Sequence, residues 1–379
     1  MKYLKSYKTK EEYADAIRGG GKTHSLPNVA LIKDDDKKPY YDVERMSDNK
    51  FKDIFDRIKE KGWNYNTTSA ITTQELALIT SDEFNSLNEV EPTNMPGKAW
   101  KGLKTFDEFK YFTGVESINA TKKSSSGNRV GGFNAAKELE SITLPSSLKE
   151  IGDFAFNMNG RIGSTYYQDT KLKYIYGGEN VEKIGYSAFQ CCSALTEFNL
   201  SDKLTDIGSL AFRNCTSLTS VTISNSVTSI GIEAFNECWN LEIVNGSNSF
   251  IRSTTTDITR LFYRCYKLKE LDLSNCDFSG IINYGASYGA NSGLHLFVAE
   301  CSSLVTLKLG KFAVSDFTNE TNYRLFDDDT SLKDIYITSD SPSLSFLESQ
   351  CVLSKIASNV TIHFGEELYT YNGSTWVKK

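Results

Sequence analysis

The fold is decided by three consecutive stretches of sequence: AFQCCSALTEFNL at residues 188–200, AFRNCTSLTSVTI at 211–223 and AFNECWNLEIVNG at 234–246. Each stretch begins with Ala-Phe, has a cysteine three positions after the phenylalanine, and has a leucine three positions after that cysteine. The stretches begin at equal intervals of 23 residues, at Ala188, Ala211 and Ala234. Self-similarity at a fixed period of about 20–50 residues indicates a repeat architecture. The sequence therefore predicts a solenoid.

The same pattern continues on both sides of these stretches. Related lines begin at Phe133, Phe156, Phe262, Phe297 and Phe326. Cysteine fills the cysteine position in five lines, and Asp329 takes it in the last one; the five are Cys192, Cys215, Cys238, Cys265 and Cys301. A second ladder lies between the lines, and its members end in Ile-Gly at Gly152, Gly185, Gly208 and Gly231. We expect about seven or eight coils.

Each line predicts one half-buried strand. Segments such as LTSVTI at 218–223 alternate apolar and polar residues, which is the period of a strand with one buried face. The glycine after each isoleucine predicts a tight turn with positive φ. The Phe, Cys and Leu positions are expected to stack into one thin core, in which each buried Phe, Leu or Ile contributes on the order of 1.5–3 kcal/mol. A charge at Phe212 or Leu218 is therefore expected to disrupt the array at its middle.

These lines resemble the BspA-type leucine-rich repeats of anaerobic gut and oral bacteria. The resemblance rests on the AFxxCxxLxxVxI line and on the intervening VTSIG segment at 227–231, and it covers roughly residues 103–340. It implies a right-handed, β-rich leucine-rich-repeat solenoid. It also implies surface-exposed adhesion and partner recognition instead of chemistry. The repeat length drifts after Val244, where the second ladder becomes hard to follow.

A small α+β module with a linker is expected before the array, over residues 1–100. Helices are predicted near 9–18 and 47–61, a β-hairpin from 28–32 and 40–43, and a short helix after a capping box that starts at Thr72. The opening of this module resembles N-terminal segments of gut-bacterial and gut-phage surface proteins with similar repeats.

The array itself is assigned residues 101–340, and residues 341–379 are assigned to a C-terminal cap. The first coil replaces the Ala-Phe and Cys pattern with an apolar residue at every third position: Phe106, Phe109, Phe112, Val115 and Ile118. A terminal coil with altered chemistry is what a repeat array needs to close its end. At the other end, 360–364 and 368–371 flank Gly365 and predict a closing hairpin.

Composition excludes two classes of partner. The net charge is −6 and there is no basic cluster, whereas a nucleic-acid binder needs a positive face to displace counterions. No segment approaches the roughly 18 apolar residues of a membrane-spanning helix, so no membrane insertion is expected.

The N-terminus is charged and lacks the apolar region of a signal peptide. Either the export signal lies outside this sequence, or the protein is a virion component released by host lysis.

The eight cysteines do not suggest a disulfide scaffold. Five of them occupy one repeat position, where a small polarizable apolar group is favoured, so we expect buried free thiols. Adjacent coils can nevertheless bring two such sulfurs near bonding distance, and a bridge stays open as an alternative. Cys191, Cys276 and Cys351 show no evident pairing.

Insertions between the lines are the first candidate binding sites, because insertions in repeat proteins form loops, often on the binding face. Three stand out, at 157–171, 245–257 and 277–293. Tyrosine supplies contact area at low entropy cost, which predicts Tyr166, Tyr167, Tyr284 and Tyr288 as anchors. The alternative is that these are tolerated surface insertions.

The outward residues of the strands are the second candidate. Equivalent positions of the lines are held by Asn199, Thr222, Asp272, Lys308 and Tyr336, which should form a row on one sheet face. Their mixed charges predict no particular ligand, and a solvated face is the alternative.

Signals for an enzyme are weak. The three histidines, His24, His295 and His363, lie in different regions and lack the spacing of a zinc site. Cys301 follows His295 closely, but it holds the repeated ladder position, so its place is the core. The acidic run 327–329 lacks the ligand spacing of a calcium loop and is expected to be a solvated turn. We therefore expect no catalysis, no metal and no cofactor.

The sequence favours a non-enzymatic recognition or adhesion protein that binds a protein or glycan on a cell surface through the sheet face and inserted loops. It would act outside the cell or on its surface. The alternative is a phage virion protein, in a tail or fibre, that docks through residues 1–100 and presents the array to a receptor or serves a structural role.

Overall fold

The computed structural model describes residues 103–120, 122–123, 129–134, 136–158, 161–162, 165–166, 170–246, 249–281, 295–311, 326, 328–337, 360–372 and 376–379. Before residue 103 it describes the short segments 6–7, 31–33, 40–42, 70–72, 77 and 79–86. Within these ranges short strands predominate, and most of them pair in parallel. Among the described residues, α4 (Ser81–Ser86) is the α-helix whose two ends are both defined. The predicted leucine-rich-repeat fold is confirmed; that the array is a right-handed solenoid stays a prediction.

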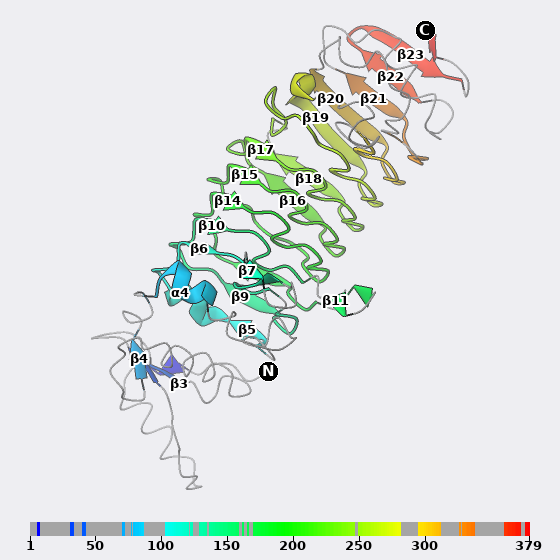
Figure 1. Ribbon diagram of the computed structural model, residues 1–379. Helices are drawn as coiled ribbons and strands as arrows, with labels where there is room; N and C mark the ends of the chain where they lie inside the picture. Colours follow the sequence, from blue (N-terminus) through cyan, green and yellow to red (C-terminus); the bar gives the residue numbers. More distant parts are fainter. Residues whose placement is uncertain are drawn as a thin grey trace.

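The strands that follow the repeat leucine form three parallel sheets in line, together called the front sheet. The first contains β5 (Thr105–Phe106), β9 (Ser141–Thr143) and β13 (Tyr174–Tyr176), and the second contains β16 (Ser220–Ile223) and β18 (Ile243–Gly246). The third begins with β19 (Glu270–Asp277), β20 (Thr306–Lys311), β21 (Asp334–Ile337) and β22 (Thr361–Phe364). Figure 1 shows these strands one after another along the elongated repeat region.

The Ile-Gly ladder forms a second parallel sheet, the side sheet, as its repetition predicts. Its five two-residue strands are β6 (Ser117–Ile118), β10 (Glu150–Ile151), β14 (Lys183–Ile184), β15 (Asp206–Ile207) and β17 (Ser229–Ile230). The isoleucine of each strand is buried. Short elements connect the coils: the 3-10 helices η5 (Asp107–Tyr111) and η6 (Phe278–Gly280), and the hairpins β7 (Lys122–Lys123) with β8 (Arg129–Val130) and β11 (Arg161–Ile162) with β12 (Thr165–Tyr166).

The repeat phenylalanines stack through the middle of the array. Successive ring centroids from Phe133 to Phe262 lie 5.1–5.7 Å apart, and the ring planes differ by 10° or less. The rings are almost completely excluded from solvent. Because each ring packs between the rings of its two neighbouring coils, no coil buries its own phenylalanine alone, and stability is shared between neighbours.

The repeat cysteines have a hydrogen-bonding role in addition to their packing role. Each thiol donates to the carbonyl oxygen of the phenylalanine in the preceding coil, over 3.1–3.4 Å, at Cys192, Cys215, Cys238, Cys265 and Cys301. The seven described cysteines are buried free thiols, which agrees with the expectation for the five ladder positions. A thiol suits this position because it is small and apolar yet supplies a weak donor.

The predicted role of the side-sheet glycines is wrong. Gly152, Gly185, Gly208 and Gly231 do not have positive φ; the positive values occur at other residues, among them Leu210 (φ 61°) and Glu233 (φ 55°). Glycine is needed instead because the coils approach closely. An added Cβ at Gly231 would lie 2.2 Å from the Ser209 nitrogen, a distance no real Cβ adopts.

The N-terminal end of the array is covered by α4. The Ser81 hydroxyl accepts hydrogen bonds from the backbone nitrogens of Glu116 and Ser117, each at 2.9 Å. Asn85 adds a donor–acceptor pair by donating to the Ser117 carbonyl (3.2 Å) and accepting from Asn119 N (2.9 Å). These side chains form hydrogen bonds with backbone groups at the edge strand β6. The Phe84 ring stacks on the Phe109 ring, with the ring centroids 4.7 Å apart. All five apolar residues predicted for the first coil are buried.

The C-terminal hairpin is confirmed, and it extends the front sheet. β22 pairs in parallel with β21 and antiparallel with β23 (Glu367–Tyr371), which pairs in turn with β24 (Trp376–Lys378).

Of the N-terminal module, the structure confirms the predicted hairpin between β2 (Leu31–Lys33) and β3 (Tyr40–Asp42). It also shows that β1 (Ser6–Tyr7) and β4 (Ala70–Thr72) join the same sheet. The helices predicted near 9–18 and 47–61, and the capping box after Thr72, lie outside the described residues. The three domain boundaries stay predictions.

Candidate functional site: the front face

The outward side of the front sheet, here called the front face, carries two rows of side chains. Inward and outward residues alternate along these strands, most clearly in β16, where Val221 and Ile223 are buried and Thr222 is exposed. Strand registers then place equivalent residues of neighbouring strands beside one another. The described members of the first row are Thr105, Ser141, Tyr174, Ser220, Ile243, Glu270, Thr306, Asp334 and Thr361. Those of the second are Thr143, Tyr176, Thr222, Asn245, Asp272, Lys308, Tyr336 and His363.

The structure brings together part of the row that the sequence predicts. Asp272, Lys308 and Tyr336 lie in register on β19, β20 and β21. Thr222 occupies the same position on β16, but β16 and β18 form a separate sheet. Asn199 is exposed and lies outside any strand. The row is therefore interrupted, and a binding role for these five residues stays a prediction.

The predicted loop tyrosines are mostly outside the described residues. The backbone of Tyr166 pairs with Arg161 in the β11–β12 hairpin. Tyr167, Tyr284 and Tyr288 fall among residues that the structure does not describe. Their role as anchors stays a prediction.

Sequence reasoning missed several exposed apolar side chains of the front face. Tyr174 and Tyr176, two residues apart on β13, are 39% and 52% exposed, and Ile243 on β18 is 50% exposed. The two tyrosine rings lie nearly parallel, with centroids 6.2 Å apart. The spacing of Leu172 and Ile175 identifies the repeat line that contains the two tyrosines. The line is hard to recognise in the sequence because the insertion at 157–171 separates it from its Ala-Phe start.

The β19 edge of the third sheet carries a charged cluster on β19 and β20. Lys308 Nζ lies 3.0 Å from Glu270 Oε1 and 3.0 Å from Asp272 Oδ2. Hydrogen bonds to these two carboxylates raise the pKa of Lys308. Burial disfavours the charged form of Asp272, but hydrogen bonds from Ser274 and Lys308 outweigh it and lower the pKa of that carboxyl. Lys308 and Asp272 are therefore both charged near neutral pH.

Aromatic residues continue the second row beyond this cluster. The rings of Tyr336 and His363 stack with centroids 4.1 Å apart and planes within 12°. His363 Nε2 lies 2.9 Å from Asp334 Oδ1, which holds the imidazole in place. On the next strand Leu368 pairs with His363 and is 38% exposed.

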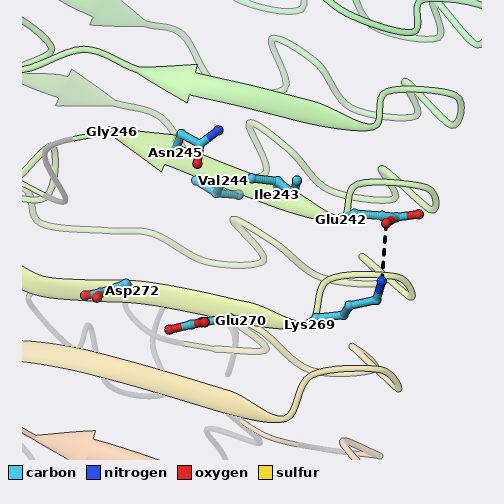
Figure 2. Close-up of a pocket in the computed structure, with 8 residues that line it drawn as sticks. All are labelled: Glu242, Ile243, Val244, Asn245, Gly246, Lys269, Glu270 and Asp272. Carbon is cyan, nitrogen blue, oxygen red and sulfur yellow. Dashed lines mark hydrogen bonds and ion pairs between the residues drawn. The ribbon is translucent and has the colours of Figure 1, made fainter.

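A cleft opens on the front face between β18 and β19. Its volume is about 440 Å3, and it is lined by Glu242, Ile243, Val244, Asn245, Gly246, Lys269, Glu270 and Asp272. Figure 2 shows the β18 residues on one side of it and Glu270 and Asp272 on the other, with the Lys269–Glu242 ion pair at one end. The two strands are neighbours along the array but belong to separate sheets.

The described residues offer little for catalysis. They contain no cluster of three or more His, Cys, Asp or Glu side chains placed to hold a metal ion. The Cys301 thiol is fully buried and donates to the Phe262 carbonyl at 3.1 Å, and burial raises its pKa well above the usual value. It is therefore a core thiol and not an activated nucleophile.

The acidic turn expected at 327–329 is not solvated at its last residue. Asp329 is fully buried, and its Oδ1 accepts a hydrogen bond from the Cys301 nitrogen at 2.7 Å. Asp329 occupies the position that cysteine has in the earlier repeats, and its carboxylate therefore lies within hydrogen-bonding distance of a backbone N–H of the preceding coil.

Over the described part of the chain, no helix has the length and apolar character needed to cross a bilayer.

Comparisons with known proteins agree with this architecture. The BspA type leucine rich repeat region matches residues 104–162 and 160–285, in six copies. No curated protein matches the sequence.

Several solved structures are similar. A leucine-rich repeat protein from Bacteroides ovatus is 23% identical, and the match covers 65% of this chain and 68% of that chain with a TM-score of 0.32. A leucine rich cell surface protein from Faecalibacterium prausnitzii is 18% identical, with 66% and 88% covered and a TM-score of 0.32. The pneumococcal vaccine antigen PcpA is 18% identical, with 60% and 67% covered and a TM-score of 0.30. The six matching copies coincide with the stacked phenylalanine, thiol and strand ladders, so residues 104–285 of this chain form a BspA type leucine rich repeat region.

Proposed function

We propose that this protein is a non-enzymatic recognition protein that binds a protein or glycan on a cell surface through its front face. Repeat arrays of this kind present extended surfaces for binding, and proteins are their usual partners. The observation that carries the proposal is the pair of exposed rings on β13, Tyr174 and Tyr176. An extracellular or cell-surface location is part of the same proposal.

Exposed tyrosines at this position favour binding over a merely solvated face. Tyrosine combines a large apolar ring with a polar tip and is enriched among the residues that dominate binding energy. The two rings lie side by side on a rigid parallel strand, so little side-chain and backbone freedom is lost when a partner covers them. Exposed apolar side chains at Ile243 and Leu368 extend this surface along the face.

The test uses the full chain, fluorescently labelled, on panels of intact gut bacteria and epithelial cells. The variant Tyr174→Ser/Tyr176→Ser is compared with the control Tyr186→Ser, which removes a tyrosine that is 43% exposed outside the front face. Saturable binding that weakens about tenfold or more in the double variant and stays unchanged in the control is expected. Binding that is insensitive to the double variant, or no saturable binding to any cell, would overturn the proposal.

Treatment of the cells separates the two kinds of partner. Loss of binding after protease treatment identifies a protein, and loss after periodate oxidation identifies a glycan.

The alternative of a phage virion protein rests on docking through residues 1–100, most of which lie outside the described residues, and it stays a prediction.

A further inference from the structure

The cleft between β18 and β19 marks a place where the repeated backbone bonding changes. At most other steps of the front sheet a carbonyl accepts hydrogen bonds from two successive nitrogens of the next coil. The Thr219 carbonyl accepts from Glu242 N (2.9 Å) and Ile243 N (3.3 Å), and the Lys269 carbonyl accepts from Val305 N (2.8 Å) and Thr306 N (3.3 Å). Between β18 and β19 the described residues show no such ladder, and an ion pair between Lys269 and Glu242 (3.4 Å) joins the coils instead.

Two local features explain why the strands separate. Gly246 ends β18 with φ +143° and approaches β16 so closely that a Cβ would lie 1.9 Å from the Ile223 carbonyl oxygen. The end of β18 is thus held against the preceding coil. The repeat from Phe235 to Phe262 spans 27 residues and is also longer than the two 23-residue repeats before it. At the far end of β19 the Asp277 nitrogen donates to the Ile251 carbonyl at 2.9 Å.

The lining of the cleft has an unbalanced charge. Three carboxylates face it or border it, those of Glu242, Glu270 and Asp272. Two ammonium groups meet them: Lys269 pairs with Glu242, and Lys308 pairs with Glu270 and Asp272. One negative charge remains, on a rim that also presents the half-exposed Ile243 and the exposed Asn245. The cleft is therefore complementary to one additional cation that carries an apolar stem.

We propose that the cleft between β18 and β19 binds a basic side chain, arginine in preference to lysine, from a protein partner that lies across the front face. This proposal rests on the proposed function and names the chemistry of the partner. The volume of about 440 Å3 lies within the range of about 300–1,000 Å3 typical of sites for small groups, so it admits a long side chain.

Arginine is preferred because its planar guanidinium can bond two oxygens at once. Glu270 and Asp272 stand two residues apart on the outward side of β19, and each contacts Lys308 through one oxygen. The other oxygen of Asp272 accepts a hydrogen bond from the Ser274 nitrogen at 3.1 Å. A carboxylate has further lone pairs available after one such bond. A guanidinium can therefore use the remaining lone pairs of the two carboxylates and donate to the Asn245 amide oxygen, while its methylene groups pack on Ile243.

The first experiment measures binding of a fluorescein-labelled peptide of four Gly-Arg repeats to the full chain by anisotropy. Peptides of four Gly-Lys and four Gly-Glu repeats are compared with it, and free L-arginine is the competitor that represents an unattached cation. The Gly-Arg peptide is expected to bind more tightly than the Gly-Lys peptide, and the Gly-Glu peptide is not expected to bind. Equal affinity of the Gly-Arg and Gly-Glu peptides, or no saturable binding, would overturn the proposal.

Matched variants then locate the binding. Glu270→Gln/Asp272→Asn is expected to weaken binding of the Gly-Arg peptide about tenfold or more, because both charged acceptors are lost. The control Glu182→Gln/Glu197→Gln removes the same charge from two exposed positions outside the cleft, and it is expected to change affinity by less than about twofold. Equal weakening by both pairs would show non-specific attraction and overturn the assignment.

A third variant fills the cleft without removing its acids. Asn245 is exposed, so the Asn245→Arg variant should fold. Circular dichroism and the thermal midpoint verify that it does. The guanidinium of the introduced side chain should occupy the cleft and abolish peptide binding. Cell binding separates the two proposals. If Tyr174→Ser/Tyr176→Ser abolishes cell binding while Asn245→Arg leaves both cell and peptide binding intact, the front-face function stands and the cleft proposal fails.

Discussion

Gly231 shows at the level of one residue why glycine directly follows the isoleucine of the side-sheet strand β17. A Cβ there would lie 2.2 Å from Ser209 N and 2.5 Å from Ser209 Cα, which are backbone atoms of the neighbouring coil and cannot rotate away. At Gly152 the nearest atom is the Asn119 side-chain Cβ at 2.9 Å, in the first step of the array. The same Ile-Gly motif is thus under different steric pressure in different coils.

This difference predicts unequal costs for the same substitution. Gly231→Ala is expected to lower the free energy of unfolding by about 1–3 kcal/mol through overpacking, and Gly152→Ala by less. Urea unfolding followed by circular dichroism measures both. Equal effects would mean that backbone approach between coils is not the reason for glycine.

Ion pairs link the turns between successive coils at the level of elements. Arg264 contacts Glu237 Oε1 at 3.1 Å and Glu300 Oε2 at 3.0 Å, and the Tyr263 hydroxyl donates to Glu300 Oε1 at 2.5 Å. Glu237, Arg264 and Glu300 all have positive φ, a conformation unfavourable for side chains larger than glycine. Contacts to neighbouring coils on both sides favour this conformation and offset its cost.

The network predicts a dependence of stability on pH. Burial disfavours the charged form of Glu300, but hydrogen bonds from Arg264 and Tyr263 outweigh it and lower its pKa in the folded protein. The stabilisation is therefore present above the unfolded-state value of about 4.3 and is lost as pH falls through the lower folded value.

Glu300→Gln should consequently reduce the urea midpoint at pH 7, and the difference from the unsubstituted protein should shrink as pH falls below about 4. Glu366→Gln, at an exposed position, is the control and should leave the urea midpoint at pH 7 nearly unchanged. A midpoint difference for Glu300→Gln that stays constant from pH 7 to pH 3 would contradict the assigned ionisation.

The whole molecule is held together by stacks that pass through consecutive coils. Phe212 packs between Phe189 and Phe235 at 5.2 and 5.3 Å, so its removal affects the interfaces on both sides. Ile362 belongs to the terminal part of the same core and has fewer coils beyond it. Because stability in a repeat array is a sum of neighbour terms, the position of a substitution should decide how far its effect spreads.

Phe212→Ala is expected to cost about 3–5 kcal/mol and to divide the array into two independently unfolding parts. Hydrogen exchange should show lost protection in the coils around Phe189 and Phe235, while β20–β22 remain protected. Ile362→Ala should instead affect protection only near the C-terminal hairpin. Uniform loss of protection along the chain in both variants would contradict the neighbour description.

Local pattern was enough to predict the repeat, the buried Phe, Cys and Ile positions, and the terminal hairpin. These features depend on which residues are buried away from water, and the spacing of apolar residues in the sequence identifies those positions. The register of Asp272, Lys308 and Tyr336 followed from the same spacing. The line that contains Tyr174 and Tyr176 has this spacing too, but an insertion separates it from its Ala-Phe start and conceals it.

Tertiary structure alone decided how the coils fit against one another. The steric reason for Gly231, the burial of Asp329 and the opening of the ladder between β18 and β19 all depend on distances between the backbones of different coils. Those distances are set by the lengths of intervening segments and by packing across the whole array, so no local window of sequence contains them. The sequence by itself therefore determined the repeat and its core, whereas the tertiary structure decided where the front face is continuous and where it opens.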